Sequence, residues 1–120
     1  ILYIEDNPAN LLLMKQTLSR VPNTHMISAL NAEDGIASAK EYVPDLILMD
    51  INLPGMNGLE AIKWLKEGDV TATIPIIAIS ASAMTGDIKR GYQAGAVRYI
   101  TKPINVTEAI DVVREILDQR

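Results

Sequence analysis

Residues 45–58 read DLILMDINLPGMNG and contain the pattern from which the fold can be inferred. Residues 46–49 are apolar without a break and stand between turn-forming residues. A run this short indicates a strand buried on both faces, as in a parallel sheet. The run ends at Asp50, and a Pro-Gly and an Asn-Gly pair follow. Because the functional groups of open α/β sheets lie where strands end, Asp50 is the first candidate for chemistry.

The rest of the chain alternates between short apolar runs and helical patterns. The other predicted strands are residues 1–4, 25–30, 76–79 and 97–100. The predicted helices follow Asn7-Pro8, follow Asn31 as far as Pro44, span 58–66 and 84–93, and run from Asn105 to Leu117. Strands that alternate strictly with helices indicate a parallel sheet covered on both faces. We therefore expect one doubly wound α/β domain over residues 1–120, flavodoxin-like, with five strands in the order 2-1-3-4-5.

The helical patterns also predict which residues face the core. In the second and fourth helices the predicted buried positions include Val43, Met84, Ile88 and Tyr92. The helix at 84–93 contains Gly86 and Gly91, each of which costs about 1 kcal/mol relative to alanine. We expect this helix to be marginally stable, and we expect Gly91→Ala to stabilise it.

Composition excludes several functional classes. The chain has 120 residues, 48% of them hydrophobic and 22% charged, as in soluble globular proteins. A net charge of −4 with no basic stripe argues against nucleic-acid binding by this domain. Cysteine is absent, which excludes disulfides and fits a reducing, cytoplasmic compartment. No apolar run is long enough for a membrane span. The chain begins inside an apolar run without methionine, so we expect it to be part of a longer protein.

Five polar residues follow predicted strands and should meet at one edge of the sheet. They are Glu5, Asp6, Asp50, Ser80 and Lys102. The first and third strands are neighbours in the expected order, so their ends should lie about 5 Å apart. Three carboxylates this close repel one another unless a cation neutralises them, and Mg²⁺ suits oxygen ligands of this kind.

A metal, a lysine and a hydroxyl next to carboxylates suit a transferring phosphoryl group. The cation and the ammonium of Lys102 would neutralise its oxygens, and the hydroxyl of Ser80 would donate a hydrogen bond to one of them. The carboxylate of Asp50 can itself act as nucleophile and form an acyl phosphate.

The same residues carry a resemblance to a known family. The chain resembles the receiver domains of two-component response regulators over essentially its whole length. The motifs are residues 5–7 (EDN), 49–58 (MDINLPGMNG), 80–81 (SA) and 95–103 (GAVRYITKP). The chain departs from the usual pattern in having Glu5 for the commoner aspartate and Ser80 for the commoner threonine.

The resemblance implies a role for each matching position. Asp50 corresponds to the phosphoacceptor, while Ser80 and Lys102 correspond to the groups that hold phosphoryl oxygens. Tyr99 corresponds to an aromatic whose position changes with phosphorylation, and Ser80 moves with it. The implied metal ligands are Asp6 and Asp50 directly, Glu5 through metal-bound water and Asn52 through its backbone carbonyl. The Lys102-Pro103 bond corresponds to a cis peptide.

The resemblance also implies partners. The phosphoryl donor would be a histidine kinase or a histidine phosphotransfer domain, and the output surface would comprise the fourth helix, fifth strand and fifth helix. Such a domain is a signalling switch rather than an enzyme, although it assists its own phosphotransfer and dephosphorylation. An attached output or kinase domain and a homodimer both stay open.

Three other functions fit this pattern less well. A phosphatase of the haloacid-dehalogenase type needs a second aspartate two residues after the nucleophile, where this chain has Asn52. A flavin-binding domain needs an anion cradle after the first strand, where Glu5 and Asp6 would repel a phosphate. An interaction module that has lost phosphorylation usually lacks a site residue, and none is missing. The single histidine, His25, is predicted to lie at the opposite edge, which argues against a Ser-His-Asp triad.

Overall fold

The computed structural model describes residues 1–119, and Arg120, the last residue of the predicted domain, lies outside them. Five parallel strands form one sheet in the order β2-β1-β3-β4-β5, which confirms the predicted topology. The strands are β1 (Leu2–Ile4), β2 (Ile27–Ala29), β3 (Ile47–Asp50), β4 (Ile76–Ser80) and β5 (Arg98–Thr101). The helices are α1 (Pro8–Leu18), α2 (Ala32–Tyr42), α3 (Gly58–Glu67), α4 (Thr85–Ala94) and α5 (Val106–Asp118).

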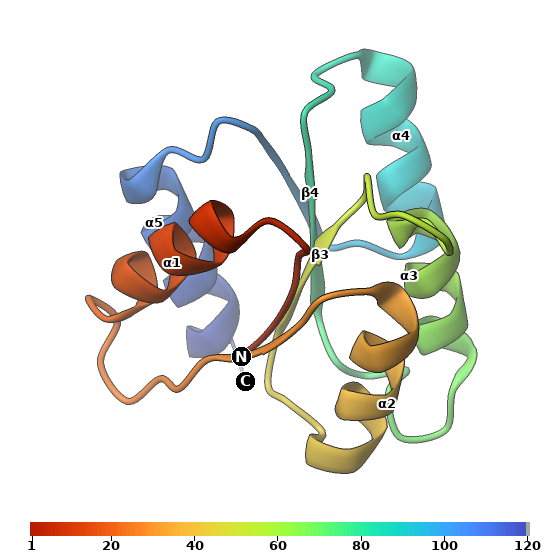
Figure 1. Cartoon of the computed structure of the whole chain (residues 1–120), viewed down its shortest axis with the longest axis horizontal. Coiled ribbons are helices and arrows are strands. Elements are labelled where there is room, and N and C mark those ends of the chain that lie inside the picture. The colour runs from red at the N-terminus through yellow and green to blue at the C-terminus, as the bar shows by residue number, and fades with distance from the viewer. Residues whose placement is uncertain (120) are drawn as a thin grey trace.

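Helices cover both faces of the sheet. Helices α1 and α5 lie on one side, and α2, α3 and α4 lie on the other (Figure 1). Side chains alternate along each strand, so Tyr3 faces α1 and α5 while its neighbours Leu2 and Ile4 face the opposite layer. The central strands are completely buried, as their uninterrupted apolar sequences predict.

Asparagine side chains fix where four of the helices begin. Asn7, Asn31, Asn57 and Asn105 precede α1, α2, α3 and α5, and each side chain accepts a hydrogen bond from a backbone N–H of the first turn. Within residues 1–119, α4 is the helix whose N-cap makes no side-chain hydrogen bond. This difference is in line with the prediction that α4 is marginally stable.

Three residues predicted to face the core are exposed, namely Val43, Met84 and Tyr92, whereas Ile88 is partly buried. Val43 is 49% exposed, because it adopts a left-handed conformation that ends α2. In α4 the buried residues are Gly91 and Ala94, whereas Met84 and Tyr92 are exposed. Small residues face the sheet here because α4 lies close to Tyr99, as described below. Across residues 1–119, none of the helices combines the length and apolar composition that a membrane span requires.

Candidate functional site

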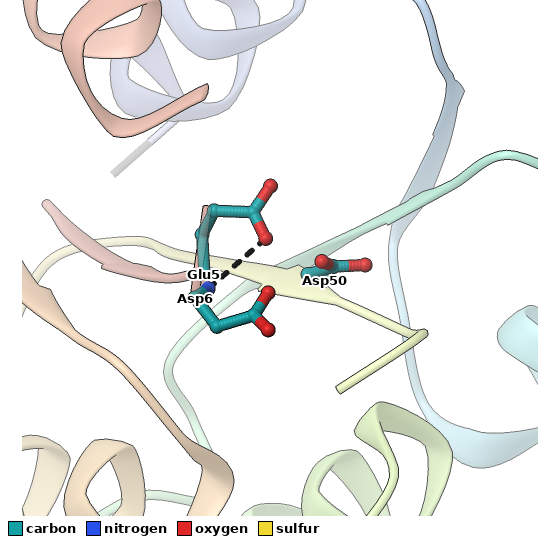
Figure 2. Close-up of side chains that lie close together, drawn as sticks. All are labelled: Glu5, Asp6 and Asp50. Carbon is teal, nitrogen blue, oxygen red and sulfur yellow. Dashed lines mark hydrogen bonds between the residues drawn. The ribbon is translucent and has the colours of Figure 1, made fainter. Parts of the chain in front are cut away.

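Three carboxylates meet where β1 and β3 end. Ile4 pairs with Met49, so Glu5 and Asp50 leave neighbouring strands at the same level. One carboxylate oxygen from each of Glu5, Asp6 and Asp50 lies within 4.8 Å of the other two, and Figure 2 shows the three side chains together. Glu5 and Asp50 are buried and Asp6 is exposed. Three hard oxygen donors with one side open to solvent fit a divalent cation such as Mg²⁺, which retains water ligands in proteins.

Lys102 reaches this cluster from the end of β5. Its ammonium Nζ lies 3.1 Å from Asp50 Oδ2 and 3.2 Å from Glu5 Oε1, so it bridges the two buried acids. Burial alone would lower the pKa of Lys102, but the hydrogen bond and charge of Asp50, followed by those of Glu5, outweigh it, and the pKa is raised. Lys102 is therefore charged at neutral pH. The Lys102-Pro103 peptide bond is cis, as the resemblance implied.

The hydroxyl of Ser80 lies beside the acids without contacting them. Ser80 Oγ donates to Asn52 Oδ1 at 3.2 Å and accepts from the backbone N–H of Ser82 at 3.1 Å. Asn52 in turn donates its backbone N–H to Asp50 Oδ1 at 3.0 Å. The loop after β3 therefore holds one oxygen of Asp50, and Lys102 holds the other.

Tyr99 connects this edge of the sheet to α4. Its ring lies between α4 and β4, against Gly91, and its hydroxyl donates to the backbone oxygen of Ser82 at 2.9 Å. A Cβ built on Gly91 would lie 2.9 Å from Tyr99 Cδ2, which is closer than side chains tolerate. A cavity of about 320 Å³ lies at the opposite edge, whereas the one beside Ser80 and Tyr99 is only about 140 Å³. The small cavity is the relevant one, because its lining includes Asn52 and Ser80.

Gly58, the first residue of α3, packs directly against the backbone of the strand end. A Cβ at Gly58 would lie 2.4 Å from the carbonyl oxygen of Asp50 and 2.6 Å from Ile51 Cα. The helix can therefore begin here only because the residue lacks a side chain.

The structure adds two residues that sequence reasoning missed. Tyr3 donates its hydroxyl to Glu5, and Asn10 donates its side-chain amide to the same carboxylate. Tyr3 lies within the strand predicted over residues 1–4, and nothing in that apolar run indicates that its hydroxyl contacts Glu5. His25 is exposed before β2, and its backbone oxygen accepts a hydrogen bond from the backbone nitrogen of Ile1 at the opposite edge of the sheet.

A doubly wound sheet with an acidic cluster, a bridging lysine and a hydroxyl at its carboxyl edge is the arrangement that the resemblance to receiver domains implied. The family model for the response regulator receiver domain matches residues 1–114. The chain therefore belongs to the response regulator receiver domain family of two-component signalling.

Curated relatives include the polar-differentiation response regulator DivK of Brucella anthropi, 41% identical over 98% of this chain and 94% of the relative. The corresponding regulator of Brucella ovis is 39% identical over the same shares.

Solved structures agree with this assignment. A receiver domain protein from Methanospirillum hungatei is 28% identical, with a TM-score of 0.88, over 98% of this chain and 92% of that one. The receiver domain of a sensor histidine kinase from Pseudomonas aeruginosa was solved with a magnesium ion in its active site cleft. It is 28% identical, with a TM-score of 0.88, over 98% of this chain and 95% of that one.

Proposed function

We propose that residues 1–120 act as one phosphorylation-activated switch in which Asp50 accepts a phosphoryl group from a phosphohistidine. The donor would be a histidine kinase or a histidine phosphotransfer domain. The observation that supports this most directly is the environment of Asp50. Its carboxylate is buried beside two further acids, with Lys102 Nζ at 3.1 Å from one oxygen and the Asn52 N–H at 3.0 Å from the other.

The transfer exchanges one phosphorus bond for another. A carboxylate oxygen of Asp50 attacks phosphorus, the bond from phosphorus to the imidazole nitrogen breaks, and the imidazole leaves with the electron pair. When bound, Mg²⁺ would neutralise charge on the phosphoryl oxygens. The residues proposed to hold it are Asp6, Asp50 and the backbone carbonyl of Asn52, with Glu5 acting through metal-bound water.

Two side chains must change partners as the phosphoryl group arrives. Lys102 now bridges Glu5 and Asp50, and its ammonium would turn to a phosphoryl oxygen. Ser80 now donates to Asn52, and its hydroxyl would donate to another phosphoryl oxygen instead. Both exchanges need only local movement, because the two groups already lie beside Asp50.

The signal would leave through Ser80, Tyr99 and α4. Ser80 accepts a hydrogen bond from the N–H of Ser82, and the backbone oxygen of Ser82 accepts one from Tyr99. Movement of Ser80 would therefore shift Ser82 and, through it, the Tyr99 ring that packs against α4. The surface formed by α4, β5 and α5 would change and control a partner or an attached domain. On this proposal the domain is a cytoplasmic switch that turns over only its own acyl phosphate.

Mass spectrometry of the intact protein tests this proposal. After incubation with Mg²⁺ and acetyl phosphate, the wild type should gain one acid-stable, base-labile phosphoryl group. Asp50→Ala should gain none, while Asp69→Ala, which removes an exposed aspartate from the loop after α3, should label like the wild type. Equal labelling of Asp50→Ala and wild type would refute the assignment.

A further inference from the structure

The carboxylate of Glu5 is surrounded by donors. Its Oε1 accepts hydrogen bonds from Asn10 Nδ2 at 2.7 Å, from Lys102 Nζ at 3.2 Å and from the Tyr3 hydroxyl at 3.3 Å. Its Oε2 accepts one from the backbone N–H of Asp6 at 3.1 Å. The side chain of Glu5 is completely buried, so bulk solvent does not reach it.

Tyr3 brings a hydroxyl into an otherwise apolar layer. Its side chain is fully buried on the sheet face that packs against Met14 of α1 and Val113 of α5. A phenylalanine would fill the same space without the cost of burying a hydroxyl. The hydrogen bond from this hydroxyl to Glu5 offsets that cost.

These donors matter because one of them must leave. In the proposed function Lys102 turns from Glu5 to the phosphoryl group. A buried carboxylate that loses a cationic partner without compensation is strongly disfavoured. Tyr3 and Asn10 stay in contact with Glu5 after that exchange, since neither contacts the phosphoacceptor in this structure.

We propose that Tyr3 and Asn10 are positioning residues, whose side chains hold Glu5 in place while Lys102 transfers to the phosphoryl group. This inference rests on the proposed function. The same two hydrogen bonds fix the orientation in which Glu5 faces a cation bound by Asp6 and Asp50. Loss of a residue that orients a ligand in this way typically lowers metal affinity by about 10- to 100-fold.

Tyr3→Phe is the main test, because it removes one oxygen and keeps the packing. Asn10→Ala removes the other donor, and Tyr42→Phe is the matched control, since Tyr42 is 61% exposed at the end of α2 and lines the cavity at the opposite edge. Two quantities are measured for each variant: the dissociation constant for Mg²⁺ by calorimetry, and the labelling rate with acetyl phosphate at saturating Mg²⁺.

For Tyr3→Phe and Asn10→Ala we expect Mg²⁺ to bind about tenfold more weakly, the lower end of the effect of losing such a contact. The labelling rate at saturating Mg²⁺ should also fall several-fold, and Tyr42→Phe should match the wild type in both. Urea unfolding at the assay temperature checks that each variant is folded.

A double-variant cycle separates positioning from a general effect on packing. If Tyr3 acts through Glu5, Tyr3→Phe should have no further effect in a Glu5→Ala background, which removes the acceptor. Unchanged Mg²⁺ affinity and labelling in Tyr3→Phe, or an equal loss in the Glu5→Ala background, would overturn the positioning role. Failure of the wild type to label would instead overturn the proposed function, and the Mg²⁺ affinities would still test the positioning role.

Discussion

The close approach of α4 to Tyr99 predicts opposite effects for two glycine-to-alanine substitutions in one helix. A Cβ at Gly91 would lie 2.9 Å and 3.1 Å from two ring atoms of Tyr99, whereas one at Gly86 would meet only Arg90 Nη1, at 3.8 Å. Each alanine gains up to about 1 kcal/mol of helix propensity. Overlap with a packed side chain costs about 1–3 kcal/mol. Gly86→Ala should therefore raise the free energy of unfolding by up to about 1 kcal/mol, and Gly91→Ala should lower it by up to about 2 kcal/mol.

Urea titrations monitored by circular dichroism give the free energies of unfolding of both variants. Removing the ring removes the conflict, so in a Tyr99→Ala background Gly91→Ala should become stabilising by about 1 kcal/mol. If Gly91→Ala stabilises the otherwise unchanged protein as much as Gly86→Ala does, the ring does not occupy the space beside Gly91. The sequence-based expectation that Gly91→Ala is stabilising would then stand.

Three further predictions concern the metal, the weak helix and pH. Asp6→Asn removes one of three clustered negative charges, so it should stabilise the metal-free protein and weaken Mg²⁺ binding. For the wild type, Mg²⁺ at about 100 times its dissociation constant should add about 2.7 kcal/mol to the free energy of unfolding. A metal-free Asp6→Asn protein that melts below the wild type would count against charge repulsion. In hydrogen exchange, the backbone amides of α4 should be less protected than those of α5, and their protection should change when the phosphoryl mimic beryllofluoride is added. If the two helices are equally protected and beryllofluoride has no effect on α4, the switch lies elsewhere. Burial lowers the pKa of Lys66, so the unfolded chain binds more protons than the folded one between that pKa and about 10.4. The unfolding free energy of the wild type minus that of Lys66→Met should therefore rise with pH up to about 10, and a constant difference would contradict this.

The sheet could be predicted from sequence because its strands are short apolar runs bounded by Pro, Gly, Asn and acidic residues. The edge strand was less well defined: residues 25–30 were predicted, and the observed strand is Ile27–Ala29. The buried face of α4 could not be predicted, because periodicity identifies apolar side chains and not how closely a helix approaches its neighbour. Ala94 and Gly91 face inward since Tyr99 fills the space that a larger side chain would need.

The positions of the candidate site residues followed from topology alone. Parallel strands place Glu5, Asp50 and Ser80 at one edge, whichever rotamers the side chains adopt. Contacts that depend on rotamers were not foreseen. Tyr3 and Asn10 meet at one oxygen of Glu5 from a strand and a helix, and no spacing in the sequence marks that convergence.

The contact of Gly58 with the backbone of Asp50 limits how this sequence can diverge. The atoms nearest to a Cβ at position 58 belong to the backbone, so any larger residue would meet the Asp50 carbonyl oxygen at 2.4 Å and Ile51 Cα at 2.6 Å. Relief would require α3 to separate from β3, or the strand end to shift and carry the carboxylate away from the ammonium of Lys102. In a library of all substitutions selected for phosphoryl labelling, Gly58 should therefore be as invariant as Asp50. Asn57, whose capping role serine, threonine or aspartate can also fill, should vary more freely.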